Sequence, residues 1–119
     1  MAENTIKLTN SIHRRLPTFI IQVIQTIIND FEPEKIILFG SYATRKQSKD
    51  SDLDLLVIME TTLAPAERQR MISRRLYPRK IPLDIIVKTP GEVRAAEKRV
   101  DPFMHAVLSE GMVVYARSG

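Results

Sequence analysis

The stretch LFGSYATRKQSKDSDLDLLVIME, residues 38–60, decides the fold of this 119-residue chain. It joins a glycine–serine turn, Gly40 and Ser41, to a pair of aspartates, Asp52 and Asp54, through ten intervening residues. An apolar run precedes the turn and another follows the pair, and such runs predict buried strands. On a strand, residues two apart point to the same face, so the two carboxylates are expected to lie together.

Two carboxylates this close repel each other, and the repulsion raises their pKa values unless a cation lies between them. A hard divalent cation that prefers oxygen ligands suits such a pair. Gly40 allows a tight exit from the strand with positive φ, or a close approach of the backbone to a ligand. A helix that begins at Ser41 would present free N–H groups and the positive end of its dipole to an anion. A phosphate site beside metal-binding carboxylates describes a nucleotide site.

Three other motifs do not match. Asp50, Asp52 and Asp54 imitate the start of a calcium-binding loop. That loop requires glycine at its sixth position and glutamate at its twelfth, where this chain has Leu55 and Thr61. No Gly-Lys-Ser/Thr follows the glycine, as a P-loop requires, and no Gly-x-Gly-x-x-Gly occurs.

Hydrophobic periodicity predicts the remaining elements. Strands are expected at 35–39, 52–59, 83–87 and 112–115, and helices at 17–31, 41–46, 65–77 and 90–110, the last broken near Asp101-Pro102. The fold class is therefore α/β (α+β), a small mixed sheet of about four strands flanked by helices. Residues 1–15 are expected to form a polar arm or a short helix, and residues 16–119 a single domain. The apolar stripe of the helix at 17–31 is interpreted as core packing, with a partner or dimer surface as the alternative.

Asp84 interrupts the apolar run of the strand expected at 83–87. A charged residue in a buried strand is costly unless it is paired or bound to a metal. We therefore interpret Asp84 as a third carboxylate of the site, with an ion pair to an arginine as the alternative. The arginine-rich helix at 65–79 is interpreted as a solvated face, and a contact with a partner protein or RNA is its alternative.

Composition narrows the class of protein further. The net charge of +4 and the isoelectric point near 9.6 suit an anionic substrate or partner. The absence of cysteine excludes a disulfide framework and a thiolate metal site. No apolar stretch reaches the roughly 18 residues of a membrane span, and residues 1–10 lack the apolar core of a signal peptide. A cytoplasmic protein is expected.

Residues 40–54 resemble the signature of the DNA polymerase β-like nucleotidyltransferase superfamily, which is Gly-Ser, a short spacer and Asp-x-Asp/Glu. Within it, the chain looks most like the minimal nucleotidyltransferases, small single-domain proteins, and the resemblance extends over roughly residues 18–115. It implies the nucleotidyltransferase fold and transfer of NMP, in the first place AMP from ATP, to a hydroxyl group. It also implies two Mg²⁺ ions, with Mn²⁺ as a substitute, held by Asp52, Asp54 and Asp84.

The resemblance further implies that Gly40 and Ser41 bind the β- and γ-phosphates. Many minimal members read Gly-Ser-x-Ala-Arg-Gly, whereas residues 40–46 read GSYATRK, so the arginine is displaced by one position and the second glycine is absent. Arg45 is kept as a candidate phosphate contact, with a solvated basic loop as an equal alternative.

A partner also follows from the resemblance, because minimal nucleotidyltransferases typically pair with a HEPN-domain protein, as antitoxin to its RNase. Some adenylylate that toxin. A chain of this length leaves no room for an acceptor-binding domain, so we expect another molecule to bind the acceptor. Nucleic acid is not required, and self-association is compatible with the sequence.

Two other functions stay open. One is a non-catalytic module that masks a partner toxin by contact alone. The other is nucleotidyl transfer to a small molecule, although relatives with that activity usually carry an added helical domain. The intact carboxylates favour an enzyme over a pure binder.

Overall fold

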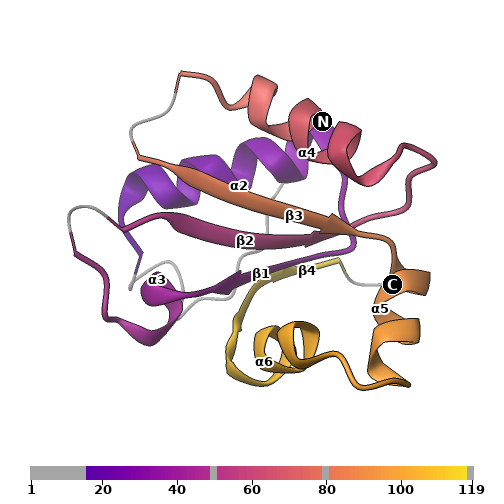
Figure 1. Ribbon diagram of the computed structural model, residues 1–119. Helices are drawn as coiled ribbons and strands as arrows, with labels where there is room; N and C mark the ends of the chain where they lie inside the picture. The colour runs from indigo at the N-terminus through magenta and orange to yellow at the C-terminus, as the bar shows by residue number, and fades with distance from the viewer. Residues whose placement is uncertain (1–15, 49–50, 79–80, 118–119) are drawn as a thin grey trace.

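Figure 1 shows the computed structural model, which describes residues 16–48, 51–78 and 81–117. Its elements are α2 (Thr18–Phe31), β1 (Lys35–Phe39), α3 (Ser41–Thr44), β2 (Leu53–Ile58), α4 (Pro65–Arg75), β3 (Leu83–Lys88), α5 (Pro90–Glu97), α6 (Pro102–Glu110) and β4 (Met112–Ala116). The strands form one sheet in the order β3-β2-β1-β4. β1 is antiparallel to β2 and β4, whereas β2 and β3 are parallel. The predicted mixed sheet flanked by helices is confirmed.

Helices α2 and α4 cover one face of the sheet (Figure 1). α2 buries its isoleucines at helical spacing, Ile20, Ile24, Ile27 and Ile28. They pack against strand residues of the same face, including Ile36, Leu55 and Ile85. The apolar stripe of this helix is therefore core packing, as interpreted from the sequence. Only part of it, including Phe19 and Val23, is left partly exposed.

Helices α5 and α6 lie on the opposite face, over one end of the sheet (Figure 1). Met104 and Val107 of α6 pack there against Ile37 of β1 and Leu56 of β2. β2 is thus enclosed on both sides, which explains its continuous apolar sequence and confirms that it is a buried strand. At the other end of this face, where β1 leads into α3, the strand residues Asp54 and Asp84 are not buried.

The helix predicted at 90–110 divides where its sequence indicates. α5 begins with a capping box in which the Thr89 hydroxyl accepts a hydrogen bond from the Glu92 N–H at 3.1 Å and the Glu92 carboxylate accepts one from the Thr89 N–H at 2.9 Å. α6 begins at Pro102, and the Asp101 carboxylate accepts a hydrogen bond from the Met104 N–H at 3.1 Å. Proline at the first helical position needs no N–H partner, so it starts a helix rather than continuing one.

The arginine-rich helix is not solvated throughout. Arg68 of α4 is 6% exposed. Its guanidinium donates to the Leu63 carbonyl at 2.8 Å, to the Val87 carbonyl at 3.2 Å and to both carboxylate oxygens of Glu92 at 2.8 and 3.2 Å. The solvated interpretation is therefore wrong for Arg68, because this side chain joins α4, β3 and α5. It fits the exposed residues Arg70 and Arg74, whereas Arg75 is exposed but forms an ion pair with Asp30 of α2.

Some predictions lie outside the described residues. They include the arm at 1–15 and residue 79, the end of the predicted arginine-rich helix. Within the described residues, no helix has the length and apolar character needed to cross a membrane.

Candidate active site

Three side chains form a row across the end of the sheet where β1 leads into α3. Phe39 of β1 is opposite Asp54 of β2 in the antiparallel ladder, and Asp54 is beside Asp84 of β3 in the parallel ladder. Paired residues of neighbouring strands point to the same face, and the strands are about 4.8 Å apart. The sheet therefore brings Asp54 and Asp84, which are 30 positions apart in the sequence, onto one face. It is the face on which α5 and α6 pack further along.

Gly40 closes the row at the end of β1. Its φ of 76° and ψ of −154° lie in a region that essentially only glycine adopts. A Cβ added at this position would overlap the Asp54 carboxylate oxygen and would lie 3.1 Å from its Cγ. The glycine of the motif is thus required twice, by the backbone turn and by the close approach of Asp54.

Asp84 differs from the expectation in one respect. It was expected to be a costly charge in a buried strand, but its side chain is exposed. The reason is that β3 is an edge strand. Within the described residues, no arginine or lysine lies within ion-pairing distance of Asp84, so the alternative of an ion pair with arginine is not observed.

This arrangement changes the pKa of Asp54. Its pKa is raised from 3.8 to about 6, first by partial burial and then by the negative charges of Asp84 and Asp52. A carboxyl group that is crowded by two others, with no cation to neutralise them, holds its proton more tightly.

Asp52 lies just before β2 and is exposed. A local turn leads into it, in which the Ser51 N–H donates to the Ser48 carbonyl at 3.1 Å and the Ser48 N–H to the Ser51 hydroxyl at 2.8 Å. The Leu53 N–H then joins the parallel ladder by donating to the Pro82 carbonyl at 2.9 Å. Asp52 therefore enters the site from the end of the turn, at the spacing that the sequence indicated.

The helix after the turn is shorter than predicted. α3 ends at Thr44 instead of 46, so it is a single turn and contributes little macrodipole. The N–H groups of Ala43 and Thr44 donate back to the Gly40 carbonyl, whereas the first N–H groups of a helix have no acceptor within it. Anion binding at Ser41 would thus rest on the first N–H groups of the helix, which have no acceptor within it, and on the Ser41 hydroxyl.

Two other residues near the turn differ in their surroundings. Tyr42 is partly buried and packs against the core. Arg45 ends α3 in a left-handed conformation with φ of 62°, and its side chain is exposed. Its role as a phosphate contact stays a prediction.

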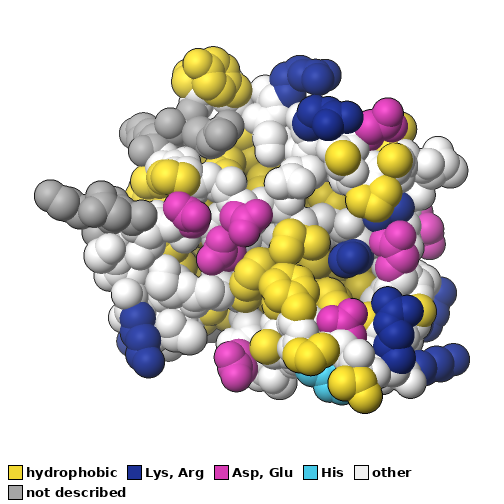
Figure 2. Space-filling model, viewed as in Figure 1, with side chains coloured by type: hydrophobic (Ala, Val, Ile, Leu, Met, Phe, Trp, Pro, Cys, Tyr) yellow, Lys and Arg dark blue, Asp and Glu magenta, His cyan; other side chains and the backbone are white. Residues whose placement is uncertain are grey.

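The candidate ligands at this end of the sheet suit a hard divalent cation, because they are carboxylate oxygens that repel one another. Among the described residues, no three Asp, Glu, His or Cys side chains are already gathered closely enough to hold a metal ion. Asp52, Asp54 and Asp84 fit such an ion by their chemistry, and the two exposed ones are free to turn toward it. Figure 2 shows acidic side chains gathered on this face beside an apolar patch.

The aromatic neighbours of the site were not identified from the sequence. The ring of Phe39 meets that of Phe103 edge to face, with centroids 5.8 Å apart and planes at 85°. Phe103 stays 45% exposed. No sequence spacing links these residues, since α6 reaches β1 only through the tertiary fold.

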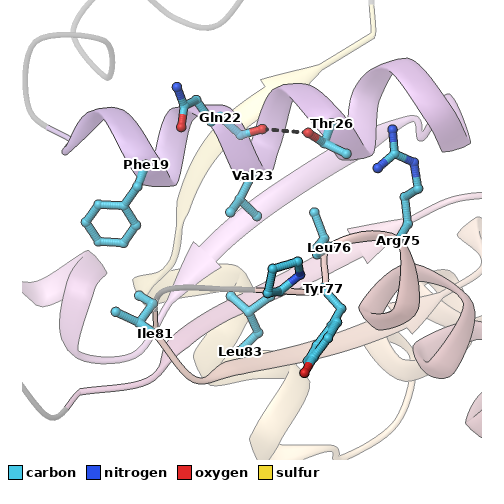
Figure 3. Close-up of a pocket in the computed structure, with 10 residues that line it drawn as sticks. Phe19, Gln22, Val23, Thr26, Arg75, Leu76, Tyr77, Ile81 and Leu83 are labelled. Atoms are coloured by element: carbon cyan, nitrogen blue, oxygen red, sulfur yellow. Dashed lines mark hydrogen bonds between the residues drawn. The ribbon is translucent and has the colours of Figure 1, made fainter.

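A groove lies away from the carboxylates (Figure 3). It has a volume of about 290 Å³ and lies between α2 and the connection from α4 to β3, with Phe19, Val23, Leu76 and Ile81 among its lining residues. None of the predicted site residues lines it.

A glycine–serine turn that lies against one of the paired aspartates at the end of the sheet is the arrangement that the nucleotidyltransferase signature predicts. The chain matches the family described as "Polymerase beta, Nucleotidyltransferase" over residues 22–119. It belongs to this family and is a nucleotidyltransferase, so the resemblance seen in the sequence is confirmed at the level of the family. No curated protein matches it.

Solved structures with the same fold are distant in sequence. A candidate nucleotidyltransferase from Sulfolobus solfataricus is 21% identical with a TM-score of 0.59, covering 88% of this chain and 83% of that chain. A toxin–antitoxin structure with AMP-PNP is 18% identical with a TM-score of 0.60, covering 82% and 73%. A mutant of the toxin–antitoxin MntA-HpeT is 16% identical with a TM-score of 0.57, covering 86% and 74%.

Proposed function

We propose that this protein transfers AMP from ATP, with Mg²⁺, to a hydroxyl group of a partner protein, and that the partner is a HEPN-domain toxin. The observation that carries the proposal is the contact between the Gly40 backbone and the Asp54 carboxylate. This contact places the turn that suits a phosphate beside the carboxylates that suit a metal ion. A neighbour with the same fold is a toxin–antitoxin structure with AMP-PNP, which supports an adenine nucleotide and a toxin partner.

The residues of the site have different roles in the proposed reaction. In the proposed step, the acceptor oxygen forms a bond to the α-phosphorus, the bond from that phosphorus to the bridging oxygen breaks, and pyrophosphate leaves. Ser41 and the N–H groups beside it hold the β- and γ-phosphates. Asp52 and Asp54 would hold the metal, and Asp84 would face the acceptor and take part in removing its proton. Two Mg²⁺ ions, when bound, would stabilise the attacking and leaving oxygens.

The test is transfer of labelled AMP from ATP to the partner that co-purifies with this protein, in the presence of Mg²⁺. Wild type should label the partner, and Asp54→Asn should not. Asp84→Asn should still bind nucleotide but lose transfer, because its work is on the attacking oxygen. Glu60→Gln is the control, since Glu60 is exposed beyond the far end of β2.

The outcomes separate the proposed function from its rival. If Asp84→Asn transfers at the wild-type rate, its assignment as third carboxylate is wrong. If wild type transfers no label from any of the four nucleoside triphosphates, the masking module is the better description. Wild type and Asp54→Asn should then inhibit the partner equally.

A further inference from the structure

A small pocket adjoins the turn that carries the proposed phosphate site. Its volume is about 170 Å³, and it is lined by Phe39, Gly40 and Thr44 on one side and by Phe103, Ala106, Val107 and Glu110 of α6 on the other. Gly40 precedes α3 and Thr44 is its last residue, so the pocket borders the turn of the proposed phosphate site. Such a volume admits one flat ring system and excludes a helix or a strand.

The lining includes an exposed aromatic ring. α6 buries Met104 and Val107, which are 2% and 3% exposed, yet leaves the Phe103 ring 45% exposed at the pocket. The edge-to-face contact with Phe39 fixes the orientation of this ring. An oriented and exposed aromatic ring beside a nucleotide site is a surface on which a base can stack.

Among the described residues that line the pocket, the ionisable side chain is a carboxylate. Glu110 is exposed at the end of α6, and no described side chain forms an ion pair with it. A carboxylate accepts hydrogen bonds and donates none when ionised. It therefore favours a ligand edge that carries an N–H group.

We propose that this pocket binds the base of the nucleoside triphosphate, with Phe103 as the stacking surface and Glu110 as an acceptor for an exocyclic amino group. The inference rests on the proposed function, since it takes the phosphates to lie at Gly40 and Ser41, and Gly40 also lines this pocket. Adenine, cytosine and guanine carry such an amino group and uracil does not, so UTP is the disfavoured nucleotide. Glutamate accepting from an exocyclic amine is a known mode of base recognition.

The experiment compares ATP with inorganic tripolyphosphate, which has no base, by calorimetry in Mg²⁺. Wild type should bind ATP more tightly than tripolyphosphate. Phe103→Ala should weaken ATP binding by roughly tenfold, the scale of one base–aromatic stack, and leave tripolyphosphate binding unchanged. Phe103→Leu keeps an apolar side chain and should show the same selective loss. Phe19→Ala, a matched truncation in the groove of Figure 3, should affect neither ligand.

Glu110→Gln tests the selectivity. Its amide can also donate a hydrogen bond to uracil oxygens, so the preference for ATP over UTP should fall by roughly tenfold. Glu97→Gln on α5 is the control.

The outcomes show whether the pocket proposal or the proposed function fails. If wild type binds ATP and tripolyphosphate equally, or if Phe103→Ala weakens both alike, the pocket does not hold the base while the phosphate site stands. An unchanged ATP preference in Glu110→Gln overturns the role of that carboxylate. If wild type binds neither ligand, both the pocket and the proposed function fall.

Discussion

The Asp54 carboxylate packs against the α-carbon of Gly40, in the space that a side chain at residue 40 would fill. Gly40 belongs to the turn after β1, and Asp54 to the adjacent strand β2. This contact explains why a glycine precedes the serine of the motif, and it makes the two halves of the site depend on each other.

Replacement of this glycine should damage the site more than the fold. Gly40→Ala introduces a strained φ and displaces the Asp54 carboxylate. We expect a loss of stability of about 1–3 kcal/mol and a loss of nucleotidyl transfer of roughly a hundredfold or more, the scale of a catalytic group displaced by about 1 Å. Chemical denaturation and the labelled-AMP assay measure the two effects.

Gly91→Ala is the matched control. It lies in the first turn of α5, and the nearest atoms to an added Cβ are 3.8 and 3.9 Å away, which is ordinary contact. It should leave transfer unchanged and cost no stability, because alanine is the better helix former. Equal activity in Gly40→Ala and Gly91→Ala would show that the contact with Asp54 is not needed.

Metal binding should stabilise the folded protein through the carboxylates. At a Mg²⁺ concentration of about 100 times the dissociation constant, linkage predicts a gain of about 2.7 kcal/mol. Asp52→Asn with Asp54→Asn should abolish this gain, whereas Glu60→Gln with Glu97→Gln should keep it. Thermal unfolding with and without Mg²⁺ measures the difference. The same metal-dependent gain in both double variants would mean that these aspartates are not the ligands.

The raised pKa of Asp54 predicts a pH dependence for the metal-free protein. In the unfolded chain this carboxyl titrates near 3.8, and in the folded protein near 6. Between these values the folded state binds more protons than the unfolded state, so the contribution of Asp54 to stability falls as the pH rises from about 4 to about 6. Metal affinity should rise over the same range, because the ligand must be deprotonated.

The measurement is urea unfolding of wild type and Asp54→Asn across this range in EDTA. The difference in unfolding free energy between the two proteins cancels the contributions of titrating groups that both proteins share. One of these is Glu92, whose pKa is lowered chiefly by the Arg68 hydrogen bond and which therefore acts in the opposite direction. A difference that stays constant between pH 4 and pH 6 would rule out a raised pKa at Asp54.

Arg68 should matter for stability rather than for chemistry. Arg68→Met keeps an apolar stem but removes the donors to Leu63, Val87 and Glu92, and we expect a cost of about 3 kcal/mol. Arg70→Met, on the exposed side of the same helix, should change stability by no more than about 0.5 kcal/mol. Urea unfolding compares the two. Similar values for both would show that the buried guanidinium contributes no more than a surface charge.

Much of the fold follows from local signals in the sequence. The bounds of β1 match the prediction, and those of β2, β3 and β4 agree within one residue at each end, because short apolar runs between turn residues have few other ways to be buried. The break at Asp101-Pro102 was predictable because proline starts a helix and cannot continue one. The spacing of Asp52 and Asp54 likewise indicated a shared face.

The relationships between distant segments required the tertiary structure. Strand order makes β3 an edge strand, which left Asp84 exposed although its sequence context suggested burial. The buried guanidinium of Arg68 has the same local sequence signal as its exposed neighbours, so only packing against β3 and α5 distinguishes it.

The sequence by itself determined the glycine–serine turn, the paired aspartates and the strands that carry them, because their physical causes act over a few residues. The tertiary structure alone decided that the Asp54 carboxylate lies against Gly40 and that Phe103 meets Phe39. Those contacts depend on strand register and on where α6 returns to the sheet, and both are set by the packing of the whole chain.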